Sequence, residues 1–241
     1  MLAQLHIPLW LGFILLIIVC YFLGAIPFSL IVGKVFYRKD LRKLGSGNLG
    51  TTNAYRCLGP VAGTIVLILD CLKGAVAIYL ARLFVPMNAS AAYYGTLSPL
   101  VRVAYRIGGY PALAAYWALI ACAVAAIVGH AFSPYINFTG GKAVAATGGI
   151  LLAMVPKVVL ILLPLFLIML LATRYVSVAS MTIAVALPFS MWLFYPSLPF
   201  IIFSVVAALF VIWLHRGNIV RLRAGTENKL GASRGQAQED H

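Results

Sequence analysis

Long apolar runs are the feature that most constrains how this chain folds. Runs of about the length needed to cross a bilayer lie at roughly 7–33, 60–86, 112–129, 157–173, 176–195 and 199–214, and a shorter one lies at 143–155. A segment inside lipid must satisfy its backbone hydrogen bonds internally, and a single run does so by forming a helix. Since 63% of all residues are also hydrophobic, the chain is predicted to be an all-α integral membrane protein.

Polar islands separate the apolar runs, and their spacing predicts the number of crossings. The islands cover residues 38–56, 130–142, 174–177 and 215–227. If they form one site, an even number of spans must separate each island from the next. Two runs separate the first pair and two separate the last pair. The stretch between the middle islands must then also cross twice, so 143–155 is predicted to be a helix of its own. The expected fold is a seven-transmembrane-helix bundle.

The distribution of charge predicts the orientation of this bundle. The chain carries 18 Lys and Arg against 5 Asp and Glu, a formal charge of +13, and most of the loop cations fall on the face of the islands. Cytoplasmic loops are the ones enriched in Lys and Arg, so we expect this face and the C-terminus in the cytoplasm and the N-terminus outside. A nucleic-acid partner is not expected, because no stripe of basic residues alternates with aromatic ones.

One membrane-embedded domain is expected over residues 1–230. Within it, residues 88–111 contain several Gly and Pro residues and are predicted to form an external loop insertion. Residues 231–241 are small, polar and charged, and we expect a disordered tail. Four cysteines show no CxxC spacing, and we expect no metal site.

The first island contains a stretch, residues 45–56, with the composition of a phosphate-binding loop. Its glycines allow backbone N–H groups to turn toward an anion, and side chains that donate hydrogen bonds accompany them: Ser46, Thr51, Thr52 and Arg56. The alternative is a polar linker between two membrane helices, which is the commoner meaning of an isolated glycine- and serine-containing loop.

The second and last islands have a related composition. Gly140, Gly141 and Lys142 place paired glycines beside a cation, just where a helix with a positive N-terminal end is expected to start. Taken alone, this is more often a turn followed by a lysine that reaches the membrane surface. His215 and Asn218 are predicted to share a helix face. A basic anchor at the membrane surface explains the neighbouring arginines but neither Asn218 nor Glu227.

Two charged residues interrupt the second long run. Asp70 and Lys73 are three positions apart and are predicted to form a mutual ion pair, because single charges inside a membrane helix are costly. We expect a structural rather than a catalytic role for them.

Together, the islands resemble the bacterial acyl-phosphate:glycerol-3-phosphate acyltransferases, the PlsY family. The resemblance runs from about residue 10 to 230. It rests on five motifs in order: Gly45-Ser46-Gly47-Asn48 with Asn53 and Arg56; Asp70-x-x-Lys73-Gly74; Gly129-His130 with Phe138-x-Gly140-Gly141-Lys142; Arg174-Tyr175-Val176-Ser177-Val178-Ala179-Ser180; and His215-Arg216-x-Asn218-Ile219 with Gly225-Thr226-Glu227.

The chain departs from the family pattern at a few positions. Thr139 and Ala143 stand where the family usually has Lys and Gly, Pro134 lies one place late, and residues 88–111 are an extra segment. Loss of the lysine at Thr139 removes one cation near the phosphates, which bears on affinity more than on activity.

The resemblance implies transfer of a fatty acyl group from acyl phosphate to the sn-1 hydroxyl of glycerol 3-phosphate, giving lysophosphatidic acid and phosphate, with no cofactor, metal or coenzyme A. It implies a multi-pass protein of the bacterial inner membrane that works at the cytoplasmic face among membrane lipids, and we expect a monomer. By matching positions, Ser177, His215 and Asn218 are catalytic. The substrate-binding residues would be Ser46, Gly47, Asn48, Asn53, Arg56, His130, Gly140, Gly141, Lys142 and Glu227.

Two other functions fit parts of the sequence. A transporter of a phosphorylated metabolite would also need basic, glycine-rich mouths, but it predicts polar islands on both faces and often an internal repeat, and the sequence shows neither. A noncatalytic lipid-binding scaffold leaves Ser46 and Asn218 unexplained. For the acyltransferase we expect direct attack by the glycerol hydroxyl, with its proton passing to His215 or to the departing phosphate.

Overall fold

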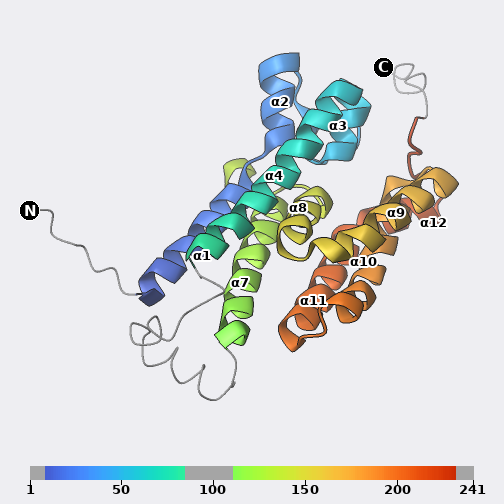
Figure 1. The fold of residues 1–241 in the computed structure, drawn as a ribbon. Coiled ribbons are helices and arrows are strands. Elements are labelled where there is room, and N and C mark those ends of the chain that lie inside the picture. Colours follow the sequence, from blue (N-terminus) through green and yellow to red (C-terminus); the bar gives the residue numbers. More distant parts are fainter. Residues whose placement is uncertain (1–8, 85–110, 232–241) are drawn as a thin grey trace, which may run out of the picture. The chain divides into compact units, whose positions relative to one another are not determined.

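The computed structural model describes residues 9–84 and 111–231, and every described element is a helix (Figure 1). The chain divides into two compact units. The first holds residues 1–156 with 197–200, and the second holds residues 157–196 with 201–241. Each unit is described by itself below.

In the described residues of the first unit there are five longer helices and three short ones. They are α1 (Leu9–Ala25), α2 (Phe28–Tyr37), the 3-10 helix η1 (Leu41–Lys43), α3 (Thr51–Leu58), α4 (Pro60–Phe84), α7 (Pro111–Ala131), the 3-10 helix η2 (Pro134–Ile136) and α8 (Val144–Met154). The helix α4 lies at the centre, where it packs against α1, α3, α7 and α8, while α1 also packs along α7.

The first apolar run is not the single helix that its composition predicts. It breaks at Ile26 and Pro27 into α1 and α2, whose axes differ by 42°. Proline has no N–H group and restricts the residue before it, so a helix seldom continues unbent through it. At the break, the carbonyl of Ala25 at the end of α1 accepts from a side chain of the segment after α7. The carbonyl of Ile26 accepts from a side chain of α4 and from the backbone N–H of Phe28.

Glycines set the close approach of α4 and α8. A methyl group on Gly149 would overlap the carbonyl oxygen of Cys71, and one on Gly74 would overlap the carbonyl oxygen of Ala146. Small residues at such crossings are a common way for membrane helices to pack, because they bring the backbones into contact. The residues from Asp70 to Gly74 are thereby held against the first half of α8.

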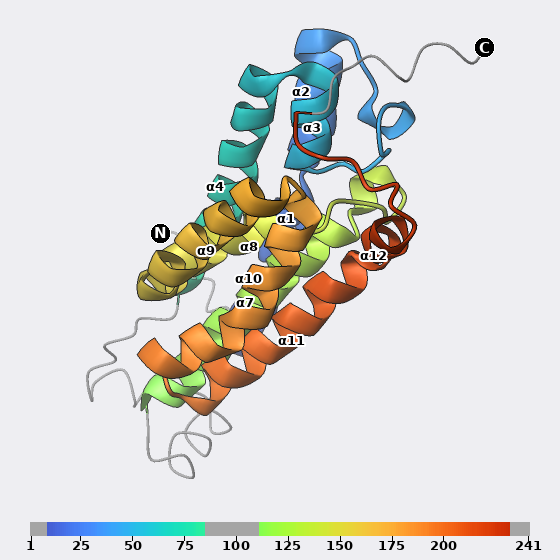
Figure 2. The ribbon, with the colours of Figure 1, turned by 90° about the vertical axis from the view of Figure 1, so that its right-hand side faces the viewer.

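The second unit is formed by α9 (Pro156–Thr173), α10 (Val176–Phe194), α11 (Leu198–Leu214) and α12 (Arg216–Arg223). In both ribbon views α10 and α11 run side by side (Figures 1 and 2). The last polar island, expected at the end of one helix, instead begins a new one. At His215 the chain bends by 53° from α11 into α12.

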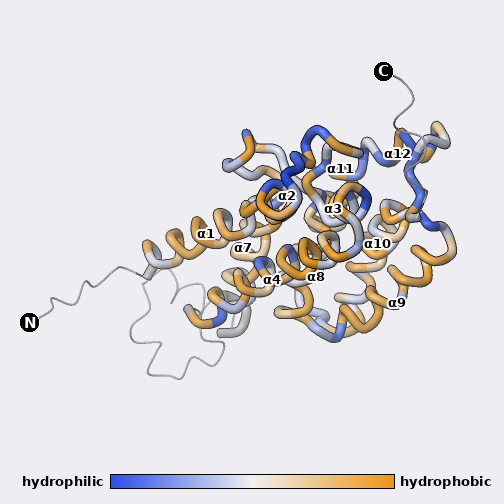
Figure 3. The backbone as a smooth tube through the Cα atoms, turned by 90° about the horizontal axis from the view of Figure 1, so that it is seen from above, coloured by the Kyte–Doolittle hydropathy of each residue, from blue (hydrophilic) through white to orange (hydrophobic). Residues whose placement is uncertain are grey.

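The helices support part of the predicted membrane topology. Among the described residues, α4, α9 and α10 are each long and apolar enough to span a bilayer, and the bent pairs α1–α2 and α11–α12 raise the number to five. Two shorter apolar helices cover 116–131 and 144–154. Seven spans therefore stay a prediction. Hydrophilic residues gather in η1, α3, α12 and the loops beside them, while the long helices are largely hydrophobic (Figure 3).

Two predictions from the sequence concern residues that lie wholly or largely outside the described part of the chain. The external loop predicted at 88–111 lies outside the described residues except for Pro111, which begins α7, and so does the tail predicted at 231–241 except for its first residue.

The crossing of α4 and α8 gives a first prediction. Gly149→Ala should destabilise the protein by about 1–3 kcal/mol, because the new methyl group forces α4 and α8 apart. The matched control is Gly148→Ala, where a methyl group meets nothing within 4 Å and the gain in helix propensity is about 1 kcal/mol. Thermal unfolding in detergent measures both variants. Equal melting temperatures would contradict this account of the crossing.

Candidate active site

The first island is half loop and half helix. We expected a loop throughout residues 45–56, but α3 begins at Thr51. The loop before it turns through Gly45 and Gly47, whose φ angles of 59° and 69° favour glycine. Arg56 lies half-buried in the last turn of α3, while Ser46 is exposed in the loop.

Asn53 holds this loop together. Its side chain is 2% exposed. Its amide nitrogen donates to the carbonyl groups of Leu41 (3.3 Å) and Leu44 (3.0 Å), and its amide oxygen accepts the N–H of Ser46 (3.0 Å). These contacts use both hydrogens of the amide. Asn53 thus fixes the position of Ser46, and its expected contact with substrate stays a prediction.

The second island is a loop with a fixed base. Ser133 and Thr139 pair through their backbones, with the N–H of Ser133 donating to the carbonyl of Thr139 (3.2 Å). The N–H of Gly141 donates to the carbonyl of His130 (3.1 Å). A side chain at Gly140 or Gly141 would overlap His130, so these glycines serve close packing as well as any role toward a ligand.

Lys142 follows directly at the start of α8. The residue after it, Ala143, has a φ of 58° and precedes the helix, which begins at Val144. The family glycine missing at this position would adopt that angle without strain. Lys142 is half-buried and lies within two residues of the helix start, as the sequence predicted. Its ammonium group and the positive end of α8 belong to the same segment.

Asp70 and Lys73 form the predicted ion pair. The ammonium nitrogen Nζ of Lys73 lies 2.8 Å from Oδ1 of Asp70, and both side chains are 2% exposed. The same ammonium donates to the carbonyl of Ile26 at the break between α1 and α2 (2.7 Å). Nδ1 of His130 lies 3.7 Å from the Asp70 carboxylate. The predicted pair is confirmed, and it has a backbone partner that spacing alone did not indicate.

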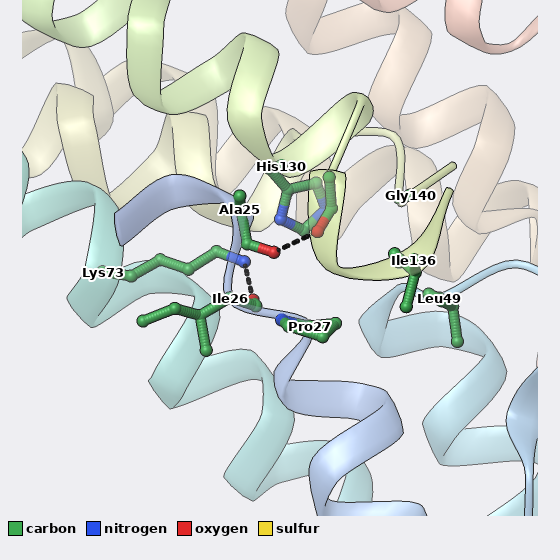
Figure 4. Close-up of a pocket in the computed structure, with 10 residues that line it drawn as sticks. Ala25, Ile26, Pro27, Leu49, Lys73, His130, Ile136 and Gly140 are labelled. Atoms are coloured by element: carbon green, nitrogen blue, oxygen red, sulfur yellow. Dashed lines mark hydrogen bonds between the residues drawn. The ribbon is translucent and has the colours of Figure 1, made fainter. Parts of the chain in front are cut away.

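These groups border a small pocket in the first unit (Figure 4). Lys73 from α4 and His130 from the end of α7 approach it from different helices, and Pro27 and Gly140 lie at its edge. Oγ of Ser133 donates to the carbonyl of Ala25 (2.7 Å) on the same wall. His130 is therefore an interior side chain that packs under the glycine loop.

Glu227 is the centre of a second cluster, in the second unit. Its oxygen Oε1 accepts hydrogen bonds from Oγ of Ser177 (2.8 Å) and Nδ2 of Asn218 (2.6 Å). Its other oxygen, Oε2, accepts from Nε of Arg221 (2.8 Å). Burial raises the pKa of Glu227, but the hydrogen bonds from Asn218, Ser177 and Arg221 outweigh it and leave the pKa below its ordinary value. The carboxylate of Glu227 thus holds two predicted catalytic side chains, and its expected contact with substrate stays a prediction.

The backbone fixes the tautomer of His215. Its Nδ1 lies 2.8 Å from the carbonyl oxygen of Val211. A carbonyl oxygen only accepts, so Nδ1 carries the hydrogen and Nε2 of the neutral ring carries the lone pair. No acidic residue near His215 in the sequence indicated how its ring is oriented. In the structure, the carbonyl of Val211, one helical turn earlier, orients it.

Each unit thus gathers part of the predicted set. The first unit holds the two glycine loops with Arg56 and Lys142, and the second brings Ser177, Asn218 and Glu227 together with His215 nearby in the chain. Sequence reasoning missed Ser133 and Arg221, although both lie inside motifs that it singled out. Within residues 9–84 and 111–231, no group of three or more His, Cys, Asp or Glu side chains is placed to hold a metal ion.

The family model described as glycerol-3-phosphate acyltransferase matches residues 14–225. The chain belongs to this family. Relatives include the glycerol-3-phosphate acyltransferase of Lacticaseibacillus casei, 40% identical over 230 residues (95% of this chain and 97% of the relative). Another, from Thermosynechococcus vestitus, is 39% identical over 221 residues (92% and 96%).

The fold also matches that of family members of known structure. A crystal structure of PlsY (YgiH), described as an integral membrane glycerol 3-phosphate acyltransferase in its glycerol 3-phosphate form, aligns with a TM-score of 0.75 at 30% identity, covering 91% of this chain and 96% of that one. The lysophosphatidic acid form of PlsY aligns with a TM-score of 0.73 at 28% identity. Family membership and the apolar helices together make this an integral membrane protein.

The Glu227 cluster predicts a defined pH dependence of stability. Because the folded-state pKa of Glu227 is depressed, its contribution is present above the ordinary value of 4.5 and is lost as pH falls below it. Glu227→Gln should therefore be less stable than the wild type at pH 7, with a difference that shrinks below about pH 4.5.

Melting temperatures in detergent from pH 7 to about pH 3.5 test this expectation. Glu239→Gln, in the C-terminal tail, is the control for loss of a carboxylate. A difference between wild type and Glu227→Gln that stays constant over this range would show that the carboxylate does not anchor the cluster.

Proposed function

We propose that this protein transfers a fatty acyl group from acyl phosphate to the sn-1 hydroxyl of glycerol 3-phosphate, releasing lysophosphatidic acid and inorganic phosphate. Its membership of the glycerol-3-phosphate acyltransferase family is the main support. The local structure adds a chemical reason. Both substrates and both products carry phosphate, and the first unit carries two glycine-containing loops, each followed by a helix and accompanied by a cation.

In this proposal the two loops hold phosphate groups. Ser46 and Arg56 supply a hydroxyl and a guanidinium from the first loop and α3, with Gly47 and Asn48 beside them. Lys142 supplies an ammonium at the start of α8, beside Gly140 and Gly141. Charge-assisted hydrogen bonds of these kinds are the usual protein contacts of phosphate oxygens.

The second unit would supply the groups around the reacting atoms. The glycerol hydroxyl oxygen attacks the acyl carbonyl carbon, the bond between this carbon and the phosphate oxygen breaks, and phosphate leaves with the electron pair. Nε2 of His215, which carries the lone pair in the neutral ring, is a suitable acceptor for the hydroxyl proton. Asn218 and Ser177 are held beside each other by Glu227.

Direct transfer suits these contacts better than an acyl-enzyme. Oγ of Ser177 does have a carboxylate within hydrogen-bond reach, as a nucleophilic serine requires. The same Glu227 oxygen also accepts from Asn218, and the depressed pKa makes the carboxylate a weak base. Acyl phosphate is already an activated mixed anhydride, so positioning and neutralisation of charge can supply much of the rate.

The proposal includes the cellular setting. We place the protein in the bacterial inner membrane as a monomer with seven spans, its N-terminus outside and its polar islands at the cytoplasmic face. The support is the concentration of loop cations on that face and the five spans or bent pairs together with two shorter apolar helices.

Turnover of the two substrates tests the reaction. Purified protein in detergent, given acyl phosphate and glycerol 3-phosphate, should form lysophosphatidic acid and phosphate in equal amounts, detected by mass spectrometry and a phosphate assay. Arg56→Ala should raise the KM for a phosphorylated substrate about ten- to a hundredfold, since a charge-assisted contact is worth roughly 1.5–3 kcal/mol. Arg56→Lys should restore only part of this loss because it lacks the planar fork of Arg.

The control for loss of a positive charge is Arg223→Ala, at the exposed end of α12, which should leave the KM unchanged. Absence of lysophosphatidic acid with every acyl-chain length tried would refute the proposed reaction. Normal kinetics in folded Arg56→Ala protein would remove only Arg56 from the site.

The state of Ser177 during turnover tests the direct mechanism. Acyl phosphate alone should cause no increase in protein mass, and Ser177→Ala should slow turnover without abolishing it, as for loss of one transition-state hydrogen bond worth up to about 4 kcal/mol. Ser190→Ala, which removes a buried hydroxyl bonded within its own helix, is the control. An acyl adduct mapped to Ser177, absent from an inactive Ser177→Ala variant, would place the nucleophile on the protein.

A further inference from the structure

The residues 70–74 of α4 touch two other parts of the first unit at once. On one side, the Lys73 ammonium donates to the carbonyl of Ile26 at the break between α1 and α2 (2.7 Å). On the other side, Gly74 lies so close to α8 that a methyl group on it would overlap the carbonyl of Ala146. This one turn of helix therefore links the break to the first turn of α8, which begins two residues after Lys142.

The break is tied to the second island by another bond. Oγ of Ser133 donates to the carbonyl of Ala25 (2.7 Å), the neighbour of Ile26. Ser133 also pairs with Thr139 across the base of the loop. The loop before Lys142 is thus fixed to the break through Ser133. The helix α8 after it packs at Ala146 against Gly74, in the turn of α4 that also contacts the break through Lys73.

His130 completes this arrangement beneath the glycines. Figure 4 shows the side chains of Lys73 and His130 reaching the pocket from different helices, with Ile26 beside the Lys73 nitrogen. The ring of His130 occupies the space that a side chain at Gly141 would need. Its Nδ1 is buried without a hydrogen-bond partner, 3.7 Å from Asp70. The ion pair and the glycine loop therefore share one buried wall.

An ion pair is an expensive way to fill this space. Burying two charges costs several kcal/mol per ion, and a well-packed apolar pair is often as stable or more stable. Stability alone therefore does not explain the pair. A long side chain with a donor at its tip can reach the carbonyl of Ile26, which also accepts the backbone N–H of Phe28 (3.1 Å), and Asp70 supplies the charge that keeps this tip in place (2.8 Å).

We propose that Lys73, held by Asp70, is a positioning residue for Lys142: it fixes the break and α8 relative to each other and so sets the place of the phosphate-binding ammonium. The inference rests on the proposed function of Lys142 as a phosphate ligand. The ion pair touches no substrate in this account, and its effect on phosphate passes through the 140–142 loop.

A double-mutant cycle tests this inference. The charge-neutral variant Asp70→Asn/Lys73→Met avoids leaving one buried charge alone. Inorganic phosphate is the probe, and its dissociation constant is obtained from the rise in melting temperature with phosphate concentration. The paired substitution should weaken phosphate binding about tenfold in the wild-type background, as expected when a ligand group is misplaced. In the Lys142→Ala background the same substitution should weaken it less than about twofold.

Arg82→Met is the matched control. Arg82 lies on the same helix and also donates to a backbone carbonyl, that of Met154 (3.3 Å), at the far end of α8 from Lys142. It should change the melting temperature without changing the dissociation constant for phosphate. Lys73→Arg, which keeps a charged donor, should restore most of the phosphate affinity.

The outcomes separate this inference from the proposed function. If Asp70→Asn/Lys73→Met raises the dissociation constant for phosphate by the same factor in the wild-type and Lys142→Ala backgrounds, the positioning role is overturned, whatever the effect on stability. The KM for each phosphorylated substrate provides the same comparison during turnover. A wild-type protein that binds phosphate with the expected coupling but forms no lysophosphatidic acid would refute the proposed reaction and leave the positioning role intact.

Discussion

A helix that breaks among other membrane helices frees backbone carbonyls, and donors from the protein must bind them because lipid offers none. The break at Ile26 and Pro27 meets this requirement through Lys73 and Ser133. Its two donors come from different segments, α4 and the loop after α7. The break between α1 and α2 is therefore a point where several segments of the first unit meet. The loop before Lys142 is bonded to this break through Ser133.

The two clusters of predicted site residues solve different physical problems. In the first unit, hydrogen bonds to backbone carbonyls and close packing at glycines fix two loops, and a cation, Arg56 or Lys142, lies near each. In the first loop, the side-chain amide of Asn53 makes these hydrogen bonds. In the second unit, one carboxylate collects neutral donors and a guanidinium around itself. Arg221 balances the charge of Glu227, so Ser177 and Asn218 are held by an anion that is itself compensated.

Sequence reasoning predicted the features that depend on local pattern. Apolar run length predicted the helices α4, α7, α9, α10 and α11, the even number of crossings predicted α8, and the three-residue spacing of Asp70 and Lys73 predicted their ion pair. The break in the first run had a signal in Pro27, but the apolar composition on both sides of it outweighed that signal. The helix α3 has only eight residues and starts within a polar, glycine-containing segment, so its length did not mark it. The contacts of Asn53 and Glu227 include partners as far as 12 and 50 positions away in the chain, which no local pattern encodes.

The shared acceptor at Glu227 has a consequence for engineering the protein. Ser177 and Asn218 come from different helices but bond to a single oxygen atom, so a larger side chain at either position displaces the carboxylate and re-aims the other donor. Substitutions at the two positions will then show strong epistasis. A search for altered substrate range that varies one position at a time will discard combinations that work only as pairs, whereas a combinatorial library over Ser177, Asn218 and Glu227 will retain them.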